Sequence, residues 1–170
     1  MYKLIKVDEN NIRDFMYVNI KAWQESYIGI INQEYLDNLD KDFDDKVSRQ
    51  INKMKNEDRS LKDRYLLCVD DKPVGIVNFG KSRLEEYPDD GELHAIYLLN
   101  VAKKYGYGKV MFDLAVKSLK DQGYKRMLIG CLNGNPSNEF YKHMGAKEIF
   151  RKKIKIGNDE YEEIYYLLEI

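Results

Sequence analysis

The run KKYGYGK, residues 103–109, is the segment whose residue types and spacing point most directly to chemistry. Its two glycines, Gly106 and Gly108, stand one residue apart where an amphipathic helix is expected to begin. Backbone N–H groups can crowd around an anion at such a place, and the helix N-terminus adds roughly half a positive charge from its aligned peptide dipoles. The segment therefore predicts a phosphate-binding loop, with the pyrophosphate of a cofactor as the expected ligand.

A strand before this loop and a helix after it must position the two glycines. Residues 92–99 have a strand-like pattern, and residues 107–121 place apolar side chains at helical spacing. The other expected strands are 2–7, 65–69, 74–80, 127–132, 147–156 and 161–169. The other expected helices are 10–25, one or two within 32–56, and 137–144. This order predicts one α/β (α+β) domain over residues 1–170, with a mixed central sheet of six to seven strands and about four helices on both faces.

Composition excludes several classes of protein. With 28 basic and 29 acidic residues, the chain lacks the charge of a nucleic-acid binder. Cys68 and Cys131 lie in apolar strand-like runs, so we expect buried small side chains and neither a disulfide framework nor a metal site. The chain shows no signal-peptide pattern and no apolar window of transmembrane length, so a cytoplasmic protein without membrane contact is expected.

Residues 91–145 carry a resemblance to a known family. ELHAIYLL, KKYGYGK, GCLNGNPSNEFY and KHMGAKE, in this order, resemble the GNAT superfamily of acetyl-CoA-dependent N-acetyltransferases. The family's phosphate loop, Gln/Arg-x-x-Gly-x-Gly/Ala, matches at Lys103, Gly106 and Gly108. Lysine at the first position departs from the pattern. It keeps the positive charge of arginine but lacks its planar, forked guanidinium group.

The resemblance implies acetyl-CoA as the co-substrate. In the family, the strand before the loop separates from its neighbour and its backbone pairs with the pantetheine arm, here at Ile96, Tyr97 and Leu98. The N–H of Leu98 is then the expected donor to the thioester oxygen. The remaining expected cofactor-binding residues are Lys103, Lys104, Tyr105, Gly106, Tyr107, Gly108, Lys109 and Asn135. Asn135 matches a variant of the second motif that is one residue shorter than usual, and a turn-initiating Asn-Pro pair is the alternative.

The resemblance also implies an acid and a base. Tyr141 matches the family tyrosine that protonates the leaving thiolate; the alternative is a core ring with a tethered hydroxyl. Glu92 precedes Lys103 at the spacing at which histone-acetylating relatives place a catalytic glutamate, so we expect it to be the base. With a period of two, Glu92, His94, Ile96 and Leu98 share one strand face, so His94 could serve instead or relay through water. A solvent-facing polar residue is the alternative for both.

The acceptor pocket is expected near WQESYIGII, residues 23–31, which is similar to a stretch in bacterial members that include polyamine acetylators. Trp23 and Tyr27 could share a helix face toward this pocket, or lie in the core. Acidic residues bracket the region and would attract a cationic amine, unless they form only a solvated surface: Glu34, Asp37, Asp40, Asp42, Asp44, Asp45, Glu85, Glu86, Asp89 and Asp90. The predicted acceptor is a small-molecule primary amine, with a lean toward a cationic amine such as a polyamine.

Other functions remain open at this stage. The protein could instead acetylate proteins or peptides, or bind acyl-CoA without catalysis, although a pure binder needs neither Tyr141 nor a base. The missing Gly-Lys-Ser/Thr ending argues against a third alternative, a nucleotide-binding P-loop protein. The apolar C-terminal run IYYLLEI could pair with a second subunit to form a homodimer.

Overall fold

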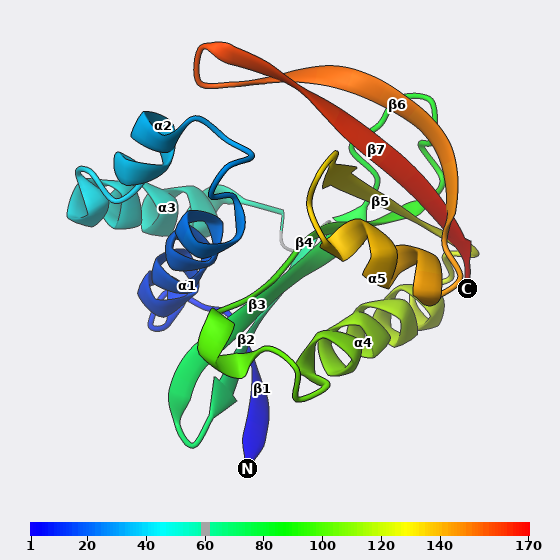
Figure 1. Ribbon diagram of the computed structural model, residues 1–170. Helices are drawn as coiled ribbons and strands as arrows, with labels where there is room; N and C mark the ends of the chain where they lie inside the picture. The colour runs from blue at the N-terminus through cyan, green and yellow to red at the C-terminus, as the bar shows by residue number, and fades with distance from the viewer. Residues whose placement is uncertain (59–61) are drawn as a thin grey trace.

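A mixed sheet of seven strands forms the centre of the molecule in the computed structural model, which describes residues 1–58 and 62–170. The spatial order of the strands is β1-β2-β3-β4-β5-β7-β6 (Figure 1). The strands are β1 (Tyr2–Lys6), β2 (Lys62–Val69), β3 (Lys72–Lys81), β4 (Gly91–Leu98), β5 (Arg126–Leu132), β6 (Lys147–Ile156) and β7 (Asp159–Glu169). The expected chain order of strands and helices is confirmed.

Helices cover both faces of this sheet, as expected. They are α1 (Ile12–Ser26), α2 (Gln33–Asp37), α3 (Phe43–Asn56), the 3₁₀ helix η2 (Asn100–Ala102), α4 (Tyr107–Asp121) and α5 (Ser137–His143). Side chains of α1 and α3 share one core cluster with Leu66 and Ile76. Side chains of α4 and α5 share the largest cluster with Val77 and Leu93, so the two helix pairs lie on opposite faces (Figure 1). No helix in the described part of the chain is long and apolar enough to span a membrane.

The local patterns explain why these segments fold as they do. The buried residues of α4 (Met111, Phe112, Ala115 and Leu119) recur at the three- and four-residue spacing of one helix face. Met127, Leu128 and Ile129 of β5 are fully buried, as a strand covered on both faces requires. Both cysteines are buried and free, which confirms their predicted role as small core side chains.

Strands β4 and β5 run parallel and stay together only at their beginnings. β4 pairs with β5 at Gly91, Glu92 and Leu93, whereas its pairing with β3 continues to Leu98. From Ala95 to Leu98 the β5 side of β4 therefore has no strand partner. This separation confirms the expected gap beside the strand that precedes the glycine loop.

A bulge in β4 overturns the expected alternation of side chains. Asn78 pairs with Ala95 and Phe79 with Leu93, so His94 is the extra residue on β4. Ile96 and Leu98 then join the cluster under α4, while Tyr97 joins the clusters on the α1 side. The prediction that Glu92, His94, Ile96 and Leu98 share one face is therefore wrong, because the bulge shifts the alternation by one residue.

The C-terminal strand is internal to the sheet. β7 pairs with β5 on one side and β6 on the other, and Ile164, Tyr165 and Tyr166 are buried within the chain. The apolar run that suggested a homodimer is thus already covered by the molecule's own core. The β6–β7 hairpin arches toward α2 (Figure 1), where the Tyr161 hydroxyl accepts a hydrogen bond from the Asn32 N–H at 2.8 Å.

Candidate active site

Two cavities meet where β4 and β5 separate. The larger has a volume of about 550 Å³ and extends over the end of β4 and the start of α4. The smaller, about 240 Å³, lies toward α1 and the β6–β7 hairpin. Their common wall consists of the residues that line both: Ile96, Tyr97, Asn135, Ser137 and Tyr141. Two ligands, one in each cavity, would meet at this wall.

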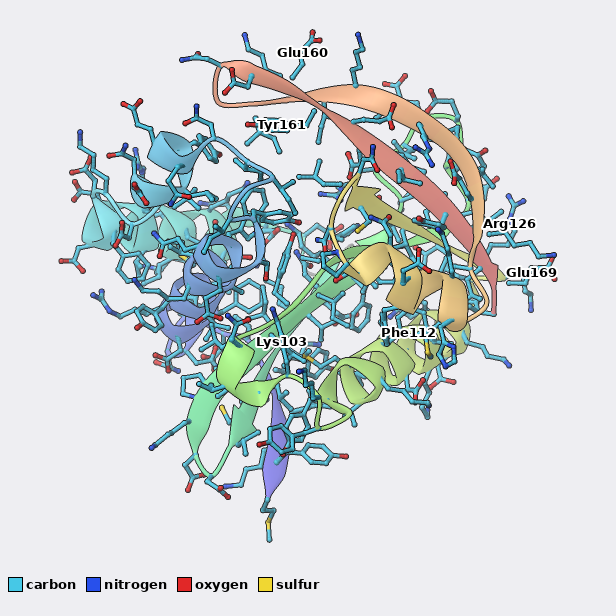
Figure 2. All side chains as sticks on the ribbon, in the orientation of Figure 1. Lys103, Phe112, Arg126, Glu160, Tyr161 and Glu169 are labelled. Atoms are coloured by element: carbon cyan, nitrogen blue, oxygen red, sulfur yellow. The ribbon has the colours of Figure 1, made fainter. Side chains whose placement is uncertain are left out.

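The larger cavity has the groups that bind phosphate. Lys103, Lys104 and Lys109 line it, and Figure 2 shows Lys103 beside the end of β4, between α1 and α4. The first hydrogen bond within α4 runs from Val110 N to Gly106 O at 3.2 Å. The N–H groups of residues 107–109 therefore have no partner within the helix and are available to an anion.

The two glycines of the loop are constrained differently. Gly106 has φ +82° and immediately precedes α4, in a conformation that other residues adopt only with strain. Gly108 has no such constraint, and a Cβ there would meet only Leu98 Cδ1 at 3.9 Å and Phe140 Cζ at 4.0 Å. Because the protein itself leaves room for a side chain at Gly108, its absence keeps the backbone open to a closely approaching ligand.

The unpaired side of β4 offers backbone donors to this cavity. Leu99 N donates to Val74 O on β3 at 2.9 Å. Successive N–H groups of a strand point to opposite sides, so the N–H of Leu98 points away from β3 into the gap. An extended amide-containing ligand can pair with a strand edge of this kind.

Most of the residues assigned to cofactor binding line the larger cavity. They are Ile96, Tyr97, Leu98, Lys103, Lys104, Gly106, Gly108, Lys109 and Asn135. Tyr105 and Tyr107 do not: Tyr105 is 72% exposed, and Tyr107 packs against the main core. Sequence reasoning missed Glu25, Ser26, Pro136, Ser137 and Phe140 as lining residues. Among these, Phe140 could have been identified from the sequence, because it precedes Tyr141 in the family motif.

Asn135 has the structural role expected of an Asn-Pro turn. Its Oδ1 accepts a hydrogen bond from Ser137 N at 2.8 Å, and its Nδ2 donates to the Tyr27 hydroxyl at 3.3 Å. The side chain thus fixes the start of α5 and ties it to α1. Its position in the wall between the cavities is compatible with contact to a ligand, which stays a prediction.

Tyr141 combines a core ring with a cavity-lining hydroxyl. The ring lies 5.6 Å from that of Phe140 and 6.2 Å from that of Tyr166, and the residue is 5% exposed. Burial holds the pKa of its hydroxyl well above the usual value of 10.0. No hydrogen bond to this hydroxyl occurs among residues 1–58 and 62–170, so the tethering alternative finds no support in that part of the chain.

Glu92 and His94 are close together but differently placed. Glu92, 2% exposed, accepts hydrogen bonds from Arg83: backbone N at 2.8 Å, Nη2 at 2.6 Å and Nε at 3.2 Å. His94 Nε2 donates to Lys81 O at 2.9 Å and lies 3.8 Å from Glu92 Oε2. Burial, and then Arg83, lower the pKa of His94 below 6.5, so its ring is neutral near pH 7 with a lone pair on Nδ1. His94 lines the smaller cavity, whereas Glu92 is not among its lining residues.

Aromatic and aliphatic side chains form most of the smaller cavity. Trp23 and Tyr27 both line it with ring centroids 4.8 Å apart, and the Tyr27 and Tyr97 hydroxyls lie 2.9 Å apart. Ile154 and Ile156 close the cavity from the β6 side. Trp23 and Tyr27 therefore satisfy both expectations, since they pack with core residues and also face the cavity.

The charged residues of this cavity differ from those expected. None of the ten acidic residues proposed for its mouth lines either cavity; Asp44 pairs with Arg13, and Asp90 with Arg126. The carboxylate that does line the smaller cavity is Glu163 of β7, which sequence reasoning missed. Gly130, within the apolar run of residues 127–132, does indicate a close approach by another group, but the sequence does not identify Glu163 as that group.

Comparison with known proteins places this geometry in a family. The model of the acetyltransferase (GNAT) family matches residues 21–146, most of the chain. The chain therefore belongs to this family, and it is a GNAT N-acetyltransferase. The matched residues include the end of α1, β4, the glycine loop and Tyr141, whereas Ile154, Ile156 and Glu163 of the smaller cavity lie outside them.

One sequence relative and two solved structures illustrate what this chain is similar to. The uncharacterized N-acetyltransferase YuaI of Bacillus subtilis is 29% identical over 156 residues, which cover 91% of this chain and 85% of YuaI. The PaiA N-acetyltransferase of Thermoplasma acidophilum, solved with coenzyme A, has the same fold at 16% identity, with a TM-score of 0.77 and coverage of 100% and 99%. YncA of Salmonella typhimurium, solved with acetyl-CoA, has a TM-score of 0.69 at 12% identity, with coverage of 99% and 93%.

Proposed function

We propose that this protein transfers the acetyl group of acetyl-CoA to the primary amine of a small molecule by direct attack. The observation that carries the proposal is the Tyr141 hydroxyl at the wall shared by two cavities, with no hydrogen-bond partner among the described residues. The larger cavity fits coenzyme A, since it combines three lysines, a free helix N-terminus and an unpaired strand edge. The smaller cavity then holds the acceptor.

The donor side of the reaction follows from the wall between the cavities. Bound acetyl-CoA supplies an activated thioester. The Leu98 N–H is aimed to donate to the thioester oxygen, where negative charge grows as the amine attacks. Tyr141 keeps its proton at neutral pH, because its pKa is raised by burial, and gives it to the sulfur as the carbon–sulfur bond breaks.

The acceptor side needs a base, because alkyl amines are mostly protonated at neutral pH. We propose that the Glu92–His94 pair takes this proton, with His94 as the member that faces the acceptor. The sequence favoured Glu92, but Glu92 is occupied by Arg83 while His94 lines the cavity as a neutral imidazole. Glu92 then acts through its charge, which raises the pKa of His94 against the opposing effect of Arg83.

Coenzyme A release from acetyl-CoA in the presence of a panel of primary amines tests the proposal. Wild-type protein should release thiol only when an amine is present, and Tyr141→Phe should lose most of that activity while still binding coenzyme A. Equal thiol release by the two proteins would contradict the proposed role of Tyr141. Acetylation of peptide N-termini alone would favour the protein-acetylating alternative, and coenzyme A binding without any turnover would favour a non-catalytic module.

A further inference from the structure

Glu163 lies over a strand position that has no side chain. On β7, Glu163 pairs with Lys152 of β6 on one side and with Leu132 of β5 on the other. A Cβ built on Gly130 of β5 would overlap Glu163 Oε1. The carboxylate therefore reaches the smaller cavity through the space that Gly130 leaves open, and any larger residue there would displace it.

No cation of the described chain forms an ion pair with Glu163, although the positive charges of Lys152 and Arg83 act on it from a greater distance. Its Oε2 accepts a hydrogen bond from the Tyr165 hydroxyl at 3.1 Å, and in residues 1–58 and 62–170 no basic group lies within 4.0 Å of it. Arg83, a nearby cation, is engaged by Glu92. Burial is the main reason why the pKa of Glu163 is raised above its usual value, as expected for a carboxylate that lacks a counter-ion.

Apolar and aromatic side chains line much of the cavity around this carboxylate, together with Arg83 and His94. Trp23, Tyr27, Ile154 and Ile156 line the same cavity, whose volume is about 240 Å³. Glu163 is its one acidic lining residue among those described, so the cavity offers a single anionic site. A ligand that fits it combines one positive charge with a compact apolar body.

We propose that Glu163 binds the ammonium group of the acceptor, and that the acceptor is a compact monoamine with an apolar or aromatic body. This inference rests on the proposed function, since it names the acceptor class of the same site. It replaces the polyamine expectation, because a second or third ammonium group would lie against apolar walls or beside the positive charge of Arg83. It also separates two roles, with Glu163 positioning the amine and His94 receiving the proton.

Calorimetric binding of 2-phenylethylamine to the coenzyme A-loaded protein tests this inference without relying on turnover. The test compares wild type with Glu163→Gln, which keeps the shape of the side chain and removes its charge. Glu162→Gln is the matched control, because the neighbouring Glu162 is exposed and contacts Arg151 outside the cavity. The uncharged analogue 2-phenylethanol reports the contribution of the ring alone.

The expected result is a Kd for 2-phenylethylamine that is roughly ten- to a hundredfold higher in Glu163→Gln, the size of a lost charge-assisted hydrogen bond. Coenzyme A affinity, 2-phenylethanol affinity and the Glu162→Gln variant should be unchanged. Equal amine affinity in wild type and Glu163→Gln, or tighter binding of spermidine than of 2-phenylethylamine to wild type, would overturn the inference. Failure of wild type to bind coenzyme A would instead contradict the proposed function.

Discussion

For single residues, the capacity of the site to bind a ligand depends on which polar atoms already have hydrogen-bond partners within the protein. The Tyr141 hydroxyl and the Glu163 carboxylate reach the cavities, whereas the Tyr166 hydroxyl donates to Asn138 Oδ1 at 2.8 Å in the core. Buried polar groups are nearly always paired with a protein group or water. A buried ring whose hydroxyl stays free toward a cavity is therefore better explained by a ligand than by packing.

Removing the Tyr141 hydroxyl should affect catalysis far more than stability. We expect Tyr141→Phe to lower kcat roughly 100-fold or more, the usual contribution of a general acid. Its free energy of unfolding should change little, since no described partner is lost. Steady-state kinetics and urea denaturation measure the two effects.

Tyr166→Phe provides the control for this comparison. It removes a hydroxyl bonded to Asn138, so it should destabilise the fold by about 1 kcal/mol and leave acetyl transfer nearly unchanged. If the two variants showed the same loss of kcat, the distinction between a ligand-facing and a structural tyrosine would be wrong.

The pH dependence of kcat/KM separates His94 from Glu92. A base must be unprotonated, and the pKa of His94 is lowered below 6.5, so activity should rise with pH through a pKa below 6.5 and level off above it. His94→Gln should lose this limb. Glu92→Gln should keep it and move it to lower pH, because the Glu92 charge raises the pKa of His94.

The opposite pattern would restore the sequence-based choice of Glu92 as the base. In that case Glu92→Gln would abolish the ascending limb and His94→Gln would preserve it. Because the Tyr141 pKa lies well above 10.0, no descending limb from this residue is expected below pH 10 in any of these proteins.

At the scale of elements, sequence reasoning succeeded where local pattern determines structure. The apolar spacing of α4 and the continuous apolar run of β5 are local signals, and both elements form where expected. The bulge at His94 has no such signal, because strand alternation assumes a regular ladder. Glu163 was missed since its approach to Gly130 depends on the pairing of β7 with β5, which residue order alone does not reveal.

The glycine loop allows fold and ligand binding to be tested separately. Gly106→Ala must adopt a positive φ, so we expect a loss of about 1 kcal/mol in stability as well as weaker binding of coenzyme A. Gly108→Ala meets only ordinary contacts, so the fold should keep its stability while coenzyme A binds at least tenfold more weakly. Thermal denaturation and calorimetry distinguish the two; unchanged coenzyme A affinity in Gly108→Ala would place the phosphates elsewhere.

At the scale of the whole molecule, the acceptor cavity is closed by segments distant in sequence. α1 provides Trp23, and the far hairpin provides Ile154 and Ile156. In Figure 2, Tyr161 extends inward from this hairpin while Glu160 lies on its outer side. The hydrogen bond from the Asn32 N–H to the Tyr161 hydroxyl thus connects the start of α2 to the β6–β7 hairpin.

Removing the hydrogen bond between Asn32 and Tyr161 should affect the acceptor cavity and leave the coenzyme A cavity unchanged. We expect Tyr161→Phe to lower the free energy of unfolding by about 1 kcal/mol and to raise KM for the amine, with KM for acetyl-CoA unchanged. Glu160→Gln, on the outer surface, should change neither. An increase in KM for acetyl-CoA in Tyr161→Phe would show that the hairpin does not act on the acceptor cavity separately.

A crystal structure of the protein with bound acetyl-CoA would show where the donor lies relative to the two cavities. We expect the pyrophosphate at the N-terminus of α4, the thioester oxygen within hydrogen-bond distance of the Leu98 N–H, and the sulfur beside the Tyr141 hydroxyl. A thioester bound outside the wall shared by the two cavities, or a Tyr141 hydroxyl turned away from the sulfur, would contradict this expectation.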